Sequence, residues 1–143
     1  MIDRVAFRNA AGLAAFTLAL SSQAGAQTLS TDLGEFEYMN SCASCHGAEG
    51  AGNGPLADLL NTAPPDLTTL QAANGGVFPV SQAYAIIDGS ADVGAHGSRE
   101  MPAWGMRYME RAGESADMAP GAVDEYPRMR ILALIEYLST IQK

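Results

Sequence analysis

The two cysteines of this chain lie three residues apart and are followed directly by a histidine, in the run C-A-S-C-H at residues 42–46. This run constrains the fold more than any other feature, because three reactive side chains share a single local structure. A disulfide within the run would close too short a loop to restrict much of the unfolded chain. A zinc site needs four ligands, and the rest of the chain adds no cysteine and only one histidine, His96.

Covalent attachment of a haem is the interpretation that remains. A thioredoxin-like redox pair requires a strand-helix-strand context, which does not surround the run, whereas C-x-x-C-H is the recognised haem-attachment pattern. Residues i and i+3 share one face of a helical turn, so Cys42 and Cys45 can both form thioethers at one edge of a porphyrin. His46 follows and can ligate the iron. The run therefore predicts one covalently bound haem c, including its iron.

The residues around the motif resemble class I c-type cytochromes, in particular the monohaem, His/Met-ligated members of the bacterial periplasm. Gly34 and Tyr38 lie one helical turn apart before the motif, and a glycine-rich loop that ends at Pro55 follows it. The resemblance implies an all-α class I cytochrome c fold, with helices wrapped around one covalently bound haem and with crossing N- and C-terminal helices. It also implies that Pro55 offers its carbonyl oxygen to the far ring nitrogen of His46, which would orient the ligand.

The second axial ligand must come from another part of the chain. Met101 begins the segment M-P-A-W-G, which resembles the Met-Pro ligand loop of these cytochromes, and the proline stiffens that loop. The resemblance implies that His46 and Met101 hold the iron from opposite sides. His96 is the alternative ligand, because imidazole also binds haem iron, and Met106 and Met109 are weaker candidates.

Two further residues near Met101 are candidates for supporting contacts to the cofactor. Arg99 can pair with a haem propionate, because a guanidinium matches a carboxylate in a bidentate fashion, or it can be an ordinary surface arginine. Trp104 is expected to pack along the haem with its N–H directed toward a polar group, the alternative being plain core packing.

The hydrophobic pattern favours helices throughout. We expect one helix from the N-cap Asp32 into the motif, a short one at residues 56–60, and one capped by Ser81 that ends near Gly89. A last helix should begin near Asp124 and Pro127. Its apolar residues recur at helical spacing: Ile131, Leu134, Ile135, Leu138 and Ile141. The segment 107–123 is either a surface loop or a short extra helix with a turn.

The first 26 residues have the organisation of a secretory signal peptide. A polar start with Arg4 and Arg8 precedes an apolar run at residues 10–20, and Ala24-Gly25-Ala26 forms an A-x-A cleavage site. We expect cleavage to leave a cytochrome c domain at residues 27–143 in the periplasm. The apolar run is too short to span a bilayer unaided, and the alternative is an uncleaved N-terminal membrane anchor.

The charge of the chain bears on its partners. Sixteen acidic residues against eight basic ones give a formal net charge of -8, which argues against nucleic acid as a partner. We expect redox protein partners that present a basic face or a small apolar docking edge. Lys143 is the only lysine, so the lysine-ringed docking face of mitochondrial relatives is absent.

These features predict an electron carrier and not an enzyme. With both axial positions filled by His46 and Met101, the iron offers no site to a small-molecule substrate and passes single electrons between periplasmic redox partners. Two alternatives remain. The chain could be the haem subunit of a periplasmic dehydrogenase or oxidase complex, or a catalytic or gas-sensing protein in which Met101 is detached.

Overall fold

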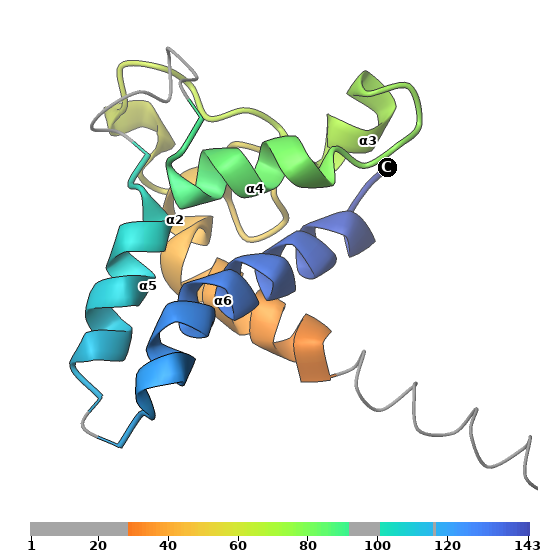
Figure 1. Ribbon diagram of the computed structural model, residues 1–143. Coiled ribbons are helices and arrows are strands. Elements are labelled where there is room, and N and C mark those ends of the chain that lie inside the picture. Colours follow the sequence, from red (N-terminus) through yellow and green to blue (C-terminus); the bar gives the residue numbers. More distant parts are fainter. Residues whose placement is uncertain (1–28, 92–100, 116) are drawn as a thin grey trace, which may run out of the picture.

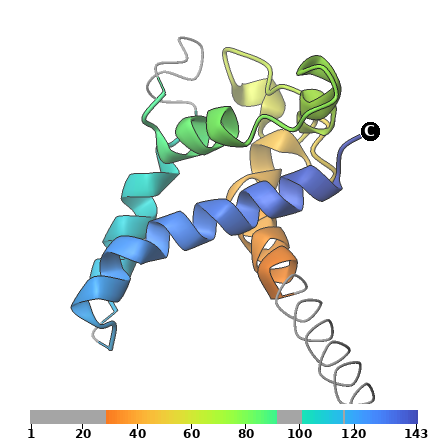
Figure 2. The ribbon, with the colours of Figure 1, turned by 45° about the vertical axis from the view of Figure 1, so that its right-hand side comes forward.

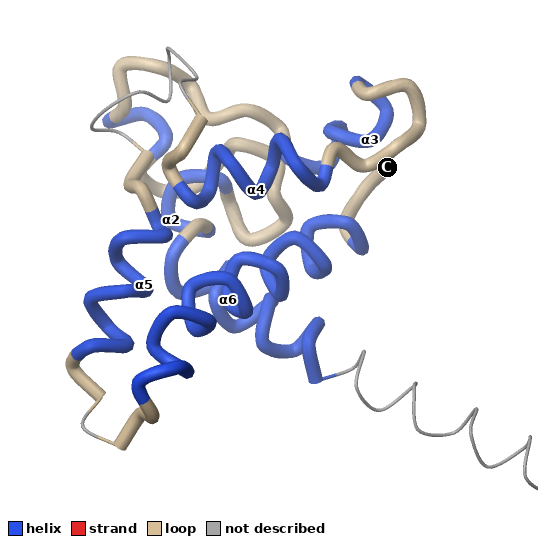
Figure 3. Tube along the Cα trace, viewed as in Figure 1, coloured by secondary structure: helices blue, strands red, loops and turns tan. Residues whose placement is uncertain are grey.

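The computed structural model describes residues 29–91, 101–115 and 117–143, and the regular structure of these residues is entirely helical (Figures 1 and 3). The expected signal peptide at residues 1–26, together with His96 and Arg99, lies outside the described residues.

The haem motif continues directly from the first described helix. That helix, here called the N-terminal helix, covers residues 29–41, and α2 (Ala43–His46) follows after a single turn residue. The expectation that Asp32 caps this helix is wrong, because residues 29–31 are already helical and Asp32 lies within the helix.

Short helices and loops form the middle of the chain. They are η1 (Ala57–Leu59), η2 (Leu67–Thr69), α3 (Leu70–Ala73) and α4 (Val80–Asp88). α4 ends as expected at Gly89, which adopts a left-handed conformation with φ 90°. Its first residue is Val80, so Ser81 lies inside the helix and does not cap it.

Two longer helices complete the fold. α5 (Trp104–Gly113) and α6 (Pro120–Thr140) enclose a turn, so the segment 107–123 is a helix followed by a turn rather than a surface loop. α6 begins at Pro120, earlier than expected, because a proline in the first turn of a helix needs no hydrogen-bond partner for its nitrogen. Pro127 is therefore inside α6 and not at its start.

The N-terminal helix crosses α6, as the two views in Figures 1 and 2 show. The backbones meet at Gly34, where an added Cβ atom would overlap with the carbonyl oxygen of Ala133. One turn further on, the rings of Tyr38 and Tyr137 pack with their centroids 5.2 Å apart. This crossing confirms the helix arrangement that the sequence predicts.

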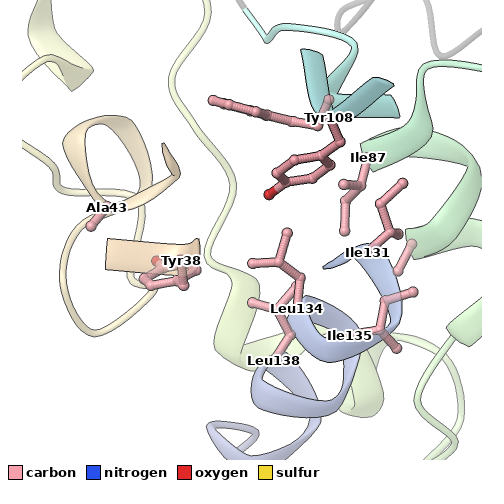
Figure 4. Close-up of a cluster of buried hydrophobic side chains, with 10 residues drawn as sticks. Tyr38, Ala43, Ile87, Tyr108, Ile131, Leu134, Ile135 and Leu138 are labelled. Atoms are coloured by element: carbon pink, nitrogen blue, oxygen red, sulfur yellow. The ribbon is translucent and has the colours of Figure 1, made fainter. Parts of the chain in front are cut away.

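Buried side chains of α6 form the centre of the core, and α4, α5 and the N-terminal helix pack around them (Figure 4). The fully buried members include Tyr38, Tyr108, Ile131 and Leu134. At the far end of α6, the side-chain amide of Gln142 donates to the carbonyl oxygen of Leu67 over 2.8 Å. The residues just after α6 are thereby joined to η2, the short helix before α3.

Candidate functional site

The glycine-rich loop after the motif folds back onto α2 and holds it. The N–H groups of Gly52, Gly54 and Leu56 donate to the carbonyl oxygens of His46, Cys45 and Ser44, respectively, over 2.8, 3.1 and 2.9 Å. These carbonyls end a helix and have no partner within it, so the loop satisfies groups that would otherwise be left without hydrogen bonds. The C-x-x-C-H run is thus fixed by its own following loop.

The motif borders two hollows with mostly apolar linings, which share Cys42, His46, Pro65 and Met101. The outer hollow is also lined by Cys45 and Trp104. The inner hollow has a volume of about 390 Å³. Its further lining comes from several elements and includes Tyr38, Leu67, Ile86, Ile87, Leu134 and Leu138.

The shared lining brings together the groups that a covalently bound haem requires. Two thiols lie on one side of the hollows, an imidazole lies beside them, and the thioether residue Met101 lines both spaces. Aliphatic and aromatic side chains supply most of the remaining surface. A mostly apolar ligand is the kind that such a lining accommodates.

His46 is buried, and its Nδ1 lies 3.4 Å from the carbonyl oxygen of Pro65. When Nδ1 carries the proton, Nε2 is left as the nitrogen with a free electron pair for a metal. The expectation placed the carbonyl of Pro55 at this nitrogen. The structure corrects it: Pro55 is exposed in the turn before η1, and the carbonyl oxygen near this ring nitrogen is that of Pro65.

Met101 is the described methionine that lines the hollows with His46. The alternatives Met106 and Met109 are 67% and 49% exposed on α5, and both line a separate hollow between α5 and α6. Met118 lines a third hollow beside α6. The arrangement favours Met101 over the other described methionines as a ligand, while His96 lies outside the described residues.

Trp104 is the aromatic residue that the sequence places next to Met101. It is the first residue of α5, is buried, and lines the outer hollow near Met101. Its indole packs against the ring of Tyr108, with centroids 6.1 Å apart, and the guanidinium of Arg107 covers it at 5.0 Å. These contacts hold the indole between the hollow and the core.

The environment of Cys42 differs from that of a redox or metal-binding thiolate. Burial, followed by the negative charge of Glu37 and the proximity of Cys45, raises the pKa of the Cys42 thiol to about 12. Reactive cysteines and zinc ligands have lowered pKa values instead. Among the described residues, no cluster of three or more His, Cys, Asp or Glu side chains is arranged to hold a metal ion.

Sequence reasoning missed a buried charged group beside the site. Glu37 is only 1% exposed and contacts Tyr108 of α5 together with Arg111 and Arg130. One signal was available: Glu37 lies three residues after Gly34, on the face of the helix that meets α6. A charged residue on that face has to be paired when it is buried.

None of the described helices combines the length and apolar character needed to cross a membrane.

An all-helical fold that brings a C-x-x-C-H run and a methionine to one apolar space defines a c-type cytochrome domain. The chain belongs to the family described as "Cytochrome C oxidase, cbb3-type, subunit III", whose model matches residues 30–114. Comparisons with curated proteins and with solved structures find no match. Membership in the family establishes a covalently bound haem c with its iron, and haem-based electron transfer as the general role. Cytochrome c domains of this type are electron carriers and are typically exported.

Proposed function

We propose that this cytochrome carries single electrons between periplasmic redox partners, through a haem bonded to Cys42 and Cys45 and ligated by His46 and Met101. The observation that carries the proposal is the outer hollow, which these four side chains line together. When bound, the haem iron supplies a one-electron couple between Fe(III) and Fe(II).

The residues around the iron have separate roles in this proposal. Pro65 orients the imidazole of His46 and increases its basicity toward the metal. The thioether of Met101 favours the reduced iron, and the apolar lining, which excludes water, acts in the same direction. With His46 and Met101 both holding the iron, the site would transfer electrons without binding a small-molecule substrate.

The first experiment tests covalent attachment. Denatured wild-type protein should retain one haem, resist extraction by acid and organic solvent, and show no thiol that can be alkylated. Cys42→Ala and Cys45→Ala should each abolish normal attachment, whereas Ser44→Ala, which changes an exposed residue between them, should not. Extractable haem together with two free thiols would contradict the proposal.

A second candidate is a haem subunit that stays bound to a periplasmic dehydrogenase or oxidase complex. The description of the matched family, an oxidase subunit, favours it. Purification of the native protein under mild conditions separates the two: a subunit copurifies with its enzyme in fixed ratio, and a free carrier does not. In either case we propose partners that present a basic face or a small apolar docking edge, because the chain has a formal net charge of -8.

Export and processing form a separate part of the proposal, based on the A-x-A site at Ala24-Gly25-Ala26. N-terminal sequencing of the periplasmic protein should begin at or near Gln27, and the protein should be recovered without detergent. Material that begins near Met1 and stays with the membrane would establish the uncleaved anchor instead.

A further inference from the structure

The carboxylate of Glu37 is buried on the helix that leads to the C-x-x-C-H run, and its partners come from two other helices. Tyr108 of α5 donates its hydroxyl to Glu37 Oε2 over 3.0 Å, and Arg130 of α6 forms an ion pair with Oε1. The guanidinium of Arg111 lies 3.6 Å from Oε2. A buried carboxylate is tolerated when it is paired and hydrogen-bonded in this way.

The carboxylate connects the N-terminal helix, which leads to the haem motif, with α5, which follows Met101. Glu37 directly precedes Tyr38, which lines the inner hollow, and it lies on the same helix that leads to Cys42. On the other side, Tyr108 projects from α5 into the core (Figure 4) and packs against Trp104, which lines the outer hollow. The negative charge of Glu37 also contributes, after burial, to the raised pKa of the Cys42 thiol, so its field reaches the attachment point.

The two arginines are not equivalent. The Arg130 side chain is 19% exposed and its guanidinium covers the ring of Tyr126 at 4.7 Å, whereas the Arg111 side chain is 50% exposed. Water screens the charge of Arg111 far more than that of Arg130. Arg130 is therefore the cation that balances Glu37 inside the protein.

Stability alone is a weak reason to keep such a pair, because apolar residues of similar volume often replace a buried ion pair without loss. Charge has a direct consequence at a redox centre, however. The oxidised iron carries one more positive charge than the reduced iron, so a nearby carboxylate favours the oxidised state and a nearby guanidinium disfavours it. In an interior of low dielectric these effects extend well beyond contact distance.

We propose that Glu37 and Arg130 form a balanced charge pair whose two members shift the reduction potential of the haem in opposite directions, the carboxylate lowering it and the guanidinium raising it. This inference rests on the proposed haem site. Glu37 and Arg130 do not ligate the iron. They change its reduction potential through the electric field of their charges.

The test uses the full-length holoprotein in potentiometric titrations at neutral pH and low ionic strength. Glu37→Gln should raise the midpoint potential, Arg130→Met should lower it, and the double variant should return close to wild type. At a fixed solution potential, each single variant should change the ratio of oxidised to reduced protein on the order of tenfold. Glu35→Gln removes the same charge from an exposed position of the same helix and should change little, since water screens it.

The opposite signs of the two potential shifts distinguish an electrostatic role of these residues from a structural one. A loosened core admits water to the haem and lowers the potential of both single variants, so two downward shifts would overturn the proposal. Two unchanged potentials in variants with wild-type spectra would overturn it as well. If Arg130→Met does not accumulate, Arg130→Lys retains the charge and should keep the potential close to wild type, while Glu37→Gln alone must still raise it. A wild-type protein without covalent haem would contradict the proposed function, whereas an intact wild-type spectrum without opposed shifts contradicts only this inference.

Discussion

Gly34 lies directly against the carbonyl oxygen of Ala133, so the N-terminal helix and α6 touch backbone to backbone at this point. A Cβ atom on Gly34 would also lie 2.8 Å from the Cβ of Tyr137. The close approach lets Tyr38 and Tyr137 pack one turn away. It also fixes the helix that carries the haem motif against the helix that lines the inner hollow.

Gly34→Ala is therefore expected to destabilise the holoprotein by about 1–3 kcal/mol, the usual effect of overpacking a core. Denaturant unfolding would measure it. The matched control is Gly121→Ala, near the start of α6, where an added Cβ meets nothing within 4 Å. Equal stability of the two variants would show that the backbones do not meet as described.

A second pair of variants tests the burial pattern of α6. Leu134 is fully buried and lines the inner hollow, whereas Leu132, two residues earlier, is 44% exposed. Leu134→Ala should cost about 2–5 kcal/mol of unfolding free energy, because it leaves a cavity. Leu132→Ala should stay within about 0.5 kcal/mol of wild type in the same unfolding measurement. A larger loss of unfolding free energy in Leu132→Ala than in Leu134→Ala would mean that α6 turns a different face toward the core.

A pH dependence is expected from Asp66, which caps η2. The hydroxyl and the backbone N–H of Thr68 both donate to its carboxylate and hold the pKa of Asp66 below its usual value. Between the two pKa values the unfolded chain binds more protons than the folded one, so this stabilisation is present above the ordinary aspartate pKa of roughly 4 and is lost as the pH falls further. Asp66→Asn should flatten the acid limb of a plot of unfolding free energy against pH. An acid limb that is unchanged in Asp66→Asn would exclude a contribution of Asp66 to the pH dependence of stability.

The axial ligand is tested most directly at Met101. Met101→Ala should yield a folded, haem-bearing protein with a lower reduction potential, because a ligand that favours reduced iron is lost. Ferric spectra should lose the sulfur-to-iron charge-transfer band. The reduced variant should bind carbon monoxide, whereas the wild-type protein at neutral pH should not.

Met106→Ala and Met109→Ala are the matched controls, because both side chains are exposed on α5 and face a different hollow. Both should keep the charge-transfer band, and His96→Ala should keep it too. A wild-type ferric spectrum that lacks the band and is unchanged in Met101→Ala, together with a high-spin His96→Ala variant, would assign the ligand to His96. Retention of the band in Met101→Ala would assign it to another methionine. Carbon monoxide binding by the wild-type protein would instead support a catalytic or gas-sensing role.

The parts of the fold that local sequence determines could be predicted. The C-x-x-C-H run, the helical spacing of Leu134 and Leu138, and the glycine that ends α4 each depend on a few neighbouring residues, and the structure contains all three as expected. The crossing at Gly34 was expected from the resemblance to class I cytochromes c, and the structure contains it.

Features that depend on distant parts of the chain were not predictable in the same way. Pro55 and Pro65 both follow the motif, and only the path of the loop decides which carbonyl reaches His46. The face that Glu37 shares with Gly34 indicates its burial, but its partners, Tyr108 and Arg130, come from helices far along the chain and could not be identified from the sequence. The early start of α6 was missed because its first residues carry little apolar periodicity and Pro127 resembled a helix start.

The hydrogen bond between Gln142 and Leu67 has a consequence for when the chain can close around a haem. The backbone N–H of Gln71 in α3 also donates to the Gln142 side-chain oxygen over 2.9 Å. Gln142, just after α6, therefore holds η2 and α3, which help to line the inner hollow. During synthesis Cys42 and Cys45 emerge long before this fastening residue exists. We therefore expect the motif to stay open to an incoming haem until the end of the chain docks on η2 and α3, and the hollow to close around the cofactor only then.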